Sequence, residues 1–334
     1  MARKRRYPLE IGVYLYLDVE AGWQRVLDAG REFFRLGLES LGHELWEELG
    51  QALARRAYVG GKRNRQVDGG VGADCSVDWV ESGRRRSRTF DYSPLKFETF
   101  VELLAHNPTL AGTGLCRWRW RPDREEMDTG TPSVDLTWRR STERWADPLP
   151  DWVELNLVSD YEHLLGTEER QQRLVKFLER VADAANPACG EVHYVTRSGR
   201  YRAPLEHLLQ RQRNTLEPPK DPIRHSRRVV RSYSWVTVIA EEIGQRLGGL
   251  AGLRDSGAFY RVVHLAGGRF LLQATRRFED YQHEQAFKVF KVLAPALPPG
   301  VPDPPKVYPP HVDVGLDDDP EFMIVQQDPS SVLS

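Results

Sequence analysis

The chain has 334 residues, of which 40% are hydrophobic and 28% charged, enough for one large or two ordinary folded domains. The overall net charge is −1: residues 301–334 hold seven acidic residues and one Lys, whereas the first 300 residues carry only +5, which argues against a dedicated nucleic-acid-binding protein. The three Cys residues lie far apart without a Cys-x-x-Cys pair, so the sequence predicts neither a disulfide framework nor a zinc-ribbon site.

The sequence shows no targeting or membrane segment. The apolar stretch after the basic residues at the N-terminus is too short for a signal peptide and has no small-residue cleavage site. No apolar run approaches the roughly 20 residues that a membrane-spanning helix needs. We therefore expect a cytoplasmic protein without a membrane partner.

The N-terminal segment predicts a strand followed by a long helix. Residues 11–17 are β-branched and aromatic, as in a buried strand. Apolar residues then recur at helical spacing over 23–56, where Gly30, Gly37 and Gly42 are candidate break points.

Residues 60–106 predict loops, one strand and one helix. The Gly- and Arg-rich stretch 60–72 is typical of a loop, and 76–81 is a candidate strand. Residues 83–88 contain four Arg, which indicates a hairpin tip or a loop. Pro94 is suited to the first turn of a helix that ends near residue 106.

Residues 115–121 alternate strictly between apolar and basic side chains. This period of two predicts a half-buried strand that places Cys116, Trp118 and Trp120 on one face. Residues 134–138 alternate in the same way after a polar, turn-rich segment. The two segments together predict an antiparallel hairpin.

The remaining chain predicts strands at 152–158, 191–195, 234–239, 259–265 and 269–275, and helices at 167–185, 240–247, 250–256 and 284–293. Ala-Gly-Gly between the last two strands indicates a hairpin turn. Residues 214–226 are predicted to form a Pro- and Arg-rich connection.

These elements predict an α+β protein with mixed or antiparallel sheets covered by helices. We expect an N-terminal half over 1–148, a C-terminal half over 149–300 and an extended or disordered, Pro-rich acidic tail over 301–334. The second half is predicted to begin with a strand, a helix and a strand, and the first half likewise begins with a strand and a helix. The two halves are therefore candidates for related α/β units, although no residue-level repeat connects them.

Three short motifs approach known catalytic patterns and fail. His43-Glu44 lacks the second His that a zincin helix needs, because position 47 is Glu. The Gly-rich segment 69–74 lacks the Lys-Ser or Lys-Thr of a phosphate-binding loop. Asp221, His225 and Ser226 are not accompanied by a nucleophile elbow. The sequence thus predicts no local catalytic motif, no metal site and no cofactor.

Arg-rich clusters with interleaved aromatic residues are the main functional signal. Such residues dominate the energetics of protein interfaces, although separate solvated loops would give the same sequence. We expect the binding residues to be Arg84, Arg85, Arg86, Trp118, Trp120, Arg227, Arg228 and Tyr233. Nucleic-acid binding would require these clusters on one continuous face.

The block from Ser234 to Pro299 carries a family resemblance. It contains Ser-Trp-Val-Thr-Val-Ile, Arg-Leu-Gly-Gly, Leu-Arg-Asp-Ser-Gly-Ala-Phe, Leu-Ala-Gly-Gly-Arg-Phe-Leu-Leu-Gln-Ala-Thr and Leu-Ala-Pro-Ala-Leu-Pro-Pro. This block resembles the type VI secretion immunity family of bacterial proteins, and a looser resemblance extends to the N-terminal strand and to Tyr-Glu-His at 161–163. The resemblance implies a cognate inhibitor that binds a toxin, and it transfers no catalytic residue.

Two functional hypotheses follow. The first is a non-catalytic binding protein of the immunity type, which sequesters a bacterial toxin as its protein partner. The second is a nucleic-acid or nucleotide-binding factor, or an enzyme whose site is assembled from dispersed residues. Its candidate residues are His163, His193, His207 and His264, with Asp160 and Glu162 as acidic neighbours. Two such His residues bonded to a carboxylate in a cleft would favour the enzyme.

Overall fold

The computed structural model describes residues 10–18, 22–54, 69–122, 126–140, 152–195, 224–231, 233–281 and 283–297. Contacts divide the chain into a middle unit, residues 19–185, and a terminal unit, residues 1–18 together with 186–334. The boundary predicted between residues 148 and 149, and the tail at 301–334, lie outside the described residues. The division into two related halves and a tail therefore stays a prediction.

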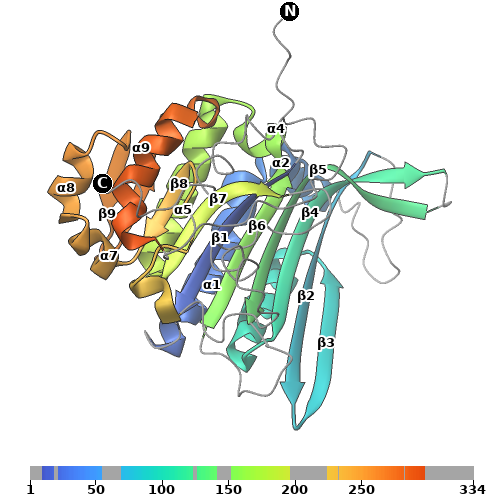
Figure 1. The fold of residues 1–334 in the computed structure, drawn as a ribbon. Coiled ribbons are helices and arrows are strands. Elements are labelled where there is room, and N and C mark those ends of the chain that lie inside the picture. Colours follow the sequence, from blue (N-terminus) through green and yellow to red (C-terminus); the bar gives the residue numbers. More distant parts are fainter. Residues whose placement is uncertain are drawn as a thin grey trace, which may run out of the picture. The chain divides into compact units, whose positions relative to one another are not determined.

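The middle unit contains a five-stranded antiparallel sheet in the order β3-β2-β4-β5-β6 (Figure 1). Its strands are β2 Val71–Glu81, β3 Arg84–Asp91, β4 Leu110–Arg121, β5 Glu126–Arg140 and β6 Trp152–Asp160. Its helices are α1 Trp23–Leu41, α2 His43–Ala54, α3 Pro94–Leu103 with the 3₁₀ turn η2 Leu104–His106, α4 Tyr161–Leu165 and α5 Glu168–Ala185. α1 packs on β5 and β6, α2 on β2 and β4, and α3 on β2, which buries the apolar stripe of each helix.

Two glycines let α1 approach the sheet closely. A Cβ at Gly30 would lie 2.5 Å from the Trp138 ring, and one at Gly37 would lie 2.5 Å from a Leu136 methyl. Helix α1 continues through Gly30 and Gly37, so the prediction of a break at these two residues is wrong. Their lack of a side chain instead allows the helix to pack closely on the sheet. Only Gly42 marks a break, because α2 begins at the next residue, His43, which has a φ of 46°.

Within the Arg-rich segment 83–88, Gly83 belongs to a hairpin turn, as a hairpin tip requires, but the four arginines lie in a strand and not in a loop. β3 pairs with β2 from Asp74↔Asp91 to Glu81↔Arg84, and the turn consists of Ser82 and Gly83 alone. Both turn residues have a positive φ, 50° and 74°, as two-residue hairpin turns require. The segment lacks an apolar alternation because it lies at a solvated edge, so the hydrophobic pattern could not reveal it.

The hairpin predicted from the alternation at 115–121 is confirmed and longer than expected. β4 and β5 pair from Leu110↔Arg139 to Arg121↔Glu126, with a register shift between Cys116 and Arg117. The shift leaves Thr131 and Pro132 of β5 without a partner in this ladder. A bulge tolerates Pro because the missing N–H is not needed there.

The terminal unit contains a second antiparallel set of strands in the order β1-β7-β8-β10-β9. These are β1 Glu10–Asp18, β7 Cys189–Val195, β8 Val236–Ile239, β9 Arg261–His264 and β10 Phe270–Gln273. Its helical segments are η3 Arg224–Arg227, α7 Glu241–Arg246, α8 Gly249–Asp255, η4 Phe278–Asp280, α9 His283–Leu293 and η5 Ala294–Ala296. The predicted β9–β10 hairpin is present, and Gly268 takes the positive φ, 85°, that its turn needs.

The α+β fold class is confirmed, and every strand pairing within each unit is antiparallel. Among the described residues, no helix has both the length and the apolar character to cross a membrane.

Candidate functional site

The outer strand of the middle unit carries a row of arginines. In β3, Arg84, Arg86 and Arg88 lie opposite Glu81, Trp79 and Val77 of β2 and therefore share one face. Alternate residues of a strand are about 6.6 Å apart, so the three side chains leave the backbone at regular intervals. We call these three residues the arginine row.

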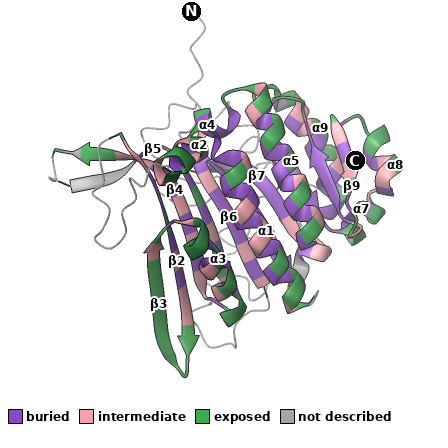
Figure 2. Ribbon diagram, turned by 180° about the vertical axis from the view of Figure 1, so that it is seen from behind, coloured by how far each residue is buried: buried purple, intermediate pink, exposed green. Residues whose placement is uncertain are grey.

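All of β3 up to Thr89 is exposed to solvent (Figure 2). The strand is last in the order of the sheet, and no described strand pairs with its outer edge. An edge of this kind presents unpaired N–H and C=O groups to any chain that can extend the sheet. Charged side chains on an edge strand limit such pairing to partners with matching charges.

Acidic residues of β2 partly balance the arginines. Arg85 binds Asp78 at 2.6 Å and Arg86 binds Glu81 at 3.1 Å. Hydrogen bonds from Ser87 and then Arg85 lower the pKa of Asp78. Residues 71–91 contain four Arg and four carboxylates, so the hairpin has no net charge. Its surface is charged but not uniformly basic.

Trp118 and Trp120, which the sequence predicts as binding residues, lie in β4 near the start of β2, whereas the arginine row lies beside the end of β2. The backbone N–H of Trp118 donates to Gly70 at 2.8 Å, and its indole packs on Gly72. Trp120 is 44% exposed. Trp118 lies opposite Gly70, and Arg86 lies opposite Trp79. Gly70 and Trp79 are nine positions apart, a separation of about 30 Å along a strand. The structure therefore does not bring the arginines and the tryptophans into one cluster (Figure 1).

The other three predicted binding residues belong to the terminal unit. Arg227 binds Asp18 at 3.0 Å and Glu242 at 3.5 Å. Arg228 is exposed, and its carbonyl accepts a hydrogen bond from Arg246. Tyr233 is only 4% exposed and its ring lies near Phe290. Tyr233 is thus a packing residue, and Arg227 holds η3 to β1 and α7.

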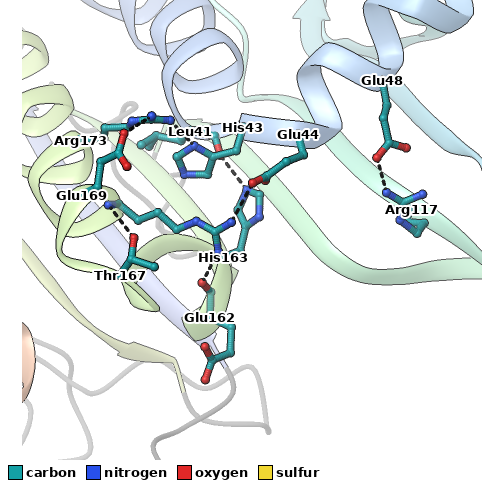
Figure 3. A network of polar contacts seen from close by, with 11 residues as sticks. Leu41, His43, Glu44, Glu48, Arg117, Glu162, His163, Thr167, Glu169 and Arg173 are labelled. Atoms are coloured by element: carbon teal, nitrogen blue, oxygen red, sulfur yellow. Dashed lines mark hydrogen bonds and ion pairs between the residues drawn. The ribbon is translucent and has the colours of Figure 1, made fainter.

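A polar network in the middle unit brings together residues that the sequence placed in separate motifs (Figure 3). His163 of α4 donates from Nε2 to the Leu41 carbonyl at 2.7 Å. Arg170 of α5 binds the Glu44 carboxylate at 2.9 Å and the Glu162 carbonyl at 2.8 Å. These bonds fasten the α1–α2 junction to α4 and α5.

The second arginine of the network faces His43. Arg173 Nη1 donates to His43 Nδ1 at 3.0 Å, and Arg173 also pairs with Glu169. The proton of a neutral His43 is then on Nε2, which is buried and has no partner among the described residues. Burial, then His163, Arg170 and Arg173, lower the pKa of His43 to about 4.

The described contacts of the network do not form a Ser-His-Asp type of arrangement. The pKa of His163 is also lowered, chiefly by burial, so both imidazoles are neutral at neutral pH. In the described contacts their ring nitrogens bond an arginine and a carbonyl, whereas the His of a Ser-His-Asp triad is oriented by a carboxylate. Asp160 accepts instead from the Ser133 backbone N–H at 2.8 Å.

The dispersed candidates for an enzyme site do not converge in the described part of the chain. His264 is exposed in the terminal unit and stacks on Phe270, with ring centroids 4.8 Å apart. His207, Asp221 and the side chains of His193 and His225 lie outside the described residues. Ser226 is buried beside Cys189 Sγ, at 3.6 Å. Within the described residues, no three His, Cys, Asp or Glu side chains are grouped to hold a metal ion.

Comparison with known proteins assigns the chain to no family. No family model matches the chain, and no curated protein does. A solved structure described as a T6SS protein of Pseudomonas aeruginosa is similar, at 13% identity and a TM-score of 0.49, over 100% of this chain and 87% of that one. A likeness of this degree transfers no function, so the proposal below depends on this chain's own residues.

Proposed function

We propose that the chain is a non-catalytic protein-binding protein, an immunity-type inhibitor that sequesters a cognate bacterial toxin. The observation that carries the proposal is the open edge of β3 with its arginine row. An extended segment of a partner can add to such an edge through backbone hydrogen bonds, while side chains at alternate positions provide specificity. Arg is among the residues that contribute most to interface energies.

The charge of the hairpin favours a protein over a nucleic acid as the partner. Phosphate backbones are bound by surfaces with an excess of positive charge, and their affinity comes from releasing counterions. Four carboxylates around four arginines remove that excess. A protein strand with acidic residues at alternate positions can pair with the arginine row, while its other residues lie beside Arg85 and Ser87 on the opposite face of β3.

The test begins with the toxin itself. The tagged full-length chain is purified from the cells that produce it, and a co-purifying toxin is identified by mass spectrometry and then expressed in a host that it kills. Co-expression of the chain should restore growth, and calorimetry should give the affinity. Reversing the row with Arg84→Glu, Arg86→Glu and Arg88→Glu should raise the dissociation constant at least about tenfold, because these charges would then repel the partner's acidic residues.

A matched control tests whether the loss of affinity comes from the arginine row itself or from the change in the total charge of the protein. Lys176→Glu, Lys288→Glu and Lys291→Glu reverse three exposed charges on α5 and α9 and should leave the affinity within about twofold. Equal weakening by both triple variants would reject the arginine row as the binding edge. Recovery of DNA or RNA with a steep salt dependence, and no toxin, would reject the function.

A further inference from the structure

The middle unit contains a cavity that neither the polar network nor the β3 edge uses. It has a volume of about 460 Å³ and lies between α1, α2 and the start of α3. Leu38, Trp46, Tyr92 and Phe97 form its apolar walls. This volume lies within the range of small-molecule and side-chain pockets in proteins.

The walls of the cavity are rings held in fixed positions. Trp46 meets Tyr92 edge-on at a centroid distance of 5.5 Å, and Tyr92 lies 5.5 Å from Phe97. Phe100 is fully buried and contacts Phe97 at 5.8 Å and Phe34 at 4.8 Å, so the rings continue into the core. Leu95 also lines the cavity and is 80% exposed, which leaves an apolar side chain in water beside it.

The polar residues of the cavity are mainly acidic. Glu39 and Glu98 line it together with one basic residue, Arg35, which binds Glu98 at 3.3 Å. Glu39 is exposed and makes no ion pair in the described part of the chain. Burial, followed by the charges of Cys75, Glu39 and Glu98, raises the pKa of Tyr92 to about 12. The carboxylates thus make the cavity a negative environment.

We propose that this cavity receives the side chain of a Lys or Arg from the partner protein, an inference that rests on the proposed protein-binding function. The apolar stem of such a side chain can lie along Leu38 and Leu95, and its cation can face the rings of Trp46 and Tyr92. Glu39 provides the opposing charge. An acidic or neutral side chain would leave the Glu39 carboxylate without a partner.

The test uses a small probe and therefore needs no toxin. The full chain is labelled with 5-fluorotryptophan, which gives one ¹⁹F signal for each of its nine Trp residues. The signal that disappears in Trp46→Phe is that of Trp46. N-acetyl-arginine methylamide is then titrated against the wild type, and N-acetyl-norleucine methylamide serves as a neutral probe of similar shape.

We expect the arginine probe to shift the Trp46 signal saturably, at millimolar concentration, and the norleucine probe to leave it unchanged. Glu39→Gln should weaken the arginine response about two- to fivefold, which is the effect of losing one exposed ion pair. Glu102→Gln removes a carboxylate from the exposed side of α3 and should have no effect.

An equal response to both probes, or no response to the arginine probe, would overturn the inference. The outcome is independent of the toxin test. A chain that inhibits no toxin could still bind the arginine probe, and a chain that inhibits one could fail to bind it.

Discussion

The imidazole of His43 stands against that of His163 at an interplanar angle of 61°, with ring centroids 4.9 Å apart. Arg170 and Arg173 lie beside the pair, and the carboxylates of Glu44 and Asp160 offset part of their charge. Protonation of His43 would place a third positive charge in this buried position. Burial disfavours the protonated form of His43 in the folded state, which makes the stability of the middle unit depend on pH.

We predict that the protein loses stability between pH 7 and pH 5. The folded-state pKa of His43 is about 4, below its ordinary value of 6.5, so the unfolded chain binds more protons in this range. The stabilisation is complete above pH 6.5 and is lost as the pH falls toward 4. It should amount to about 2 kcal/mol between pH 7 and pH 5. Urea unfolding of the wild type and of His43→Gln measures it.

Removal of the titrating group should flatten this dependence. His43→Gln is expected to be less stable than the wild type at pH 7 and to lose less of its stability at pH 5. His106→Gln is a control at a surface position. An identical pH dependence for the wild type and His43→Gln would contradict the prediction.

Gly30→Ala should destabilise the middle unit by about 1–3 kcal/mol, although Ala is the better helix former. Its methyl would lie 2.5 Å from the Trp138 ring, so helix or sheet would have to move. Gly50→Ala is the matched control, because Gly50 is in α2 with nothing within 4 Å of its Cβ position. The control should gain up to about 1 kcal/mol. Thermal unfolding compares the two variants, and equal effects would contradict close packing at Gly30.

Cys75 should be unreactive toward alkylating agents in the folded protein. Its side chain is fully buried, and burial raises the pKa of the thiol to about 12, so almost no thiolate exists at pH 8. Iodoacetamide treatment at pH 8, followed by peptide mass spectrometry, should leave Cys75 unmodified until urea unfolds the chain. Modification at the same rate with and without urea would show that Cys75 is accessible.

Ser93→Ala should cost about 1 kcal/mol, because Ser93 Oγ caps α3 by accepting from the Lys96 backbone N–H at 3.3 Å. The loss should be confined to the start of α3, beside the cavity, and should appear as faster hydrogen exchange there. Ser93→Asp keeps a capping oxygen and should restore both stability and protection. A loss of the same size in both variants would indicate that the cap is unimportant.

The sequence predicts the fold well where side chains alternate between core and solvent. The pattern over residues 115–121 correctly identifies β4, and Ala-Gly-Gly identifies the β9–β10 turn. The strand at Arg84–Asp91 is missed because both of its faces are solvated along most of its length. Arg85 stands between Arg84 and Arg86, so the arginines show no period of two in the sequence either.

The candidate sites are less predictable because they depend on contacts between distant residues. His43 and His163 are separated by 120 residues, and no local pattern links them. Similarly, the cavity draws Trp46 from α2 and Phe97 from α3. Nothing near either residue in the sequence distinguishes it from an ordinary core aromatic. Tyr233 is predicted as a binding residue from its basic neighbourhood in the sequence, but it is buried, because such a neighbourhood does not imply a surface position.

Because β1 pairs with β7, this part of the terminal unit can close only after the middle unit has been translated. Tyr16 lies opposite Cys189, so the whole middle unit is translated between the two strands. At about 5–20 residues per second, β1 waits roughly 10–35 s for its neighbour. The middle unit holds its own sheet and helices and can fold in that interval. It would then bring the ends of the long intervening segment toward each other and reduce the entropy cost of closing the terminal unit.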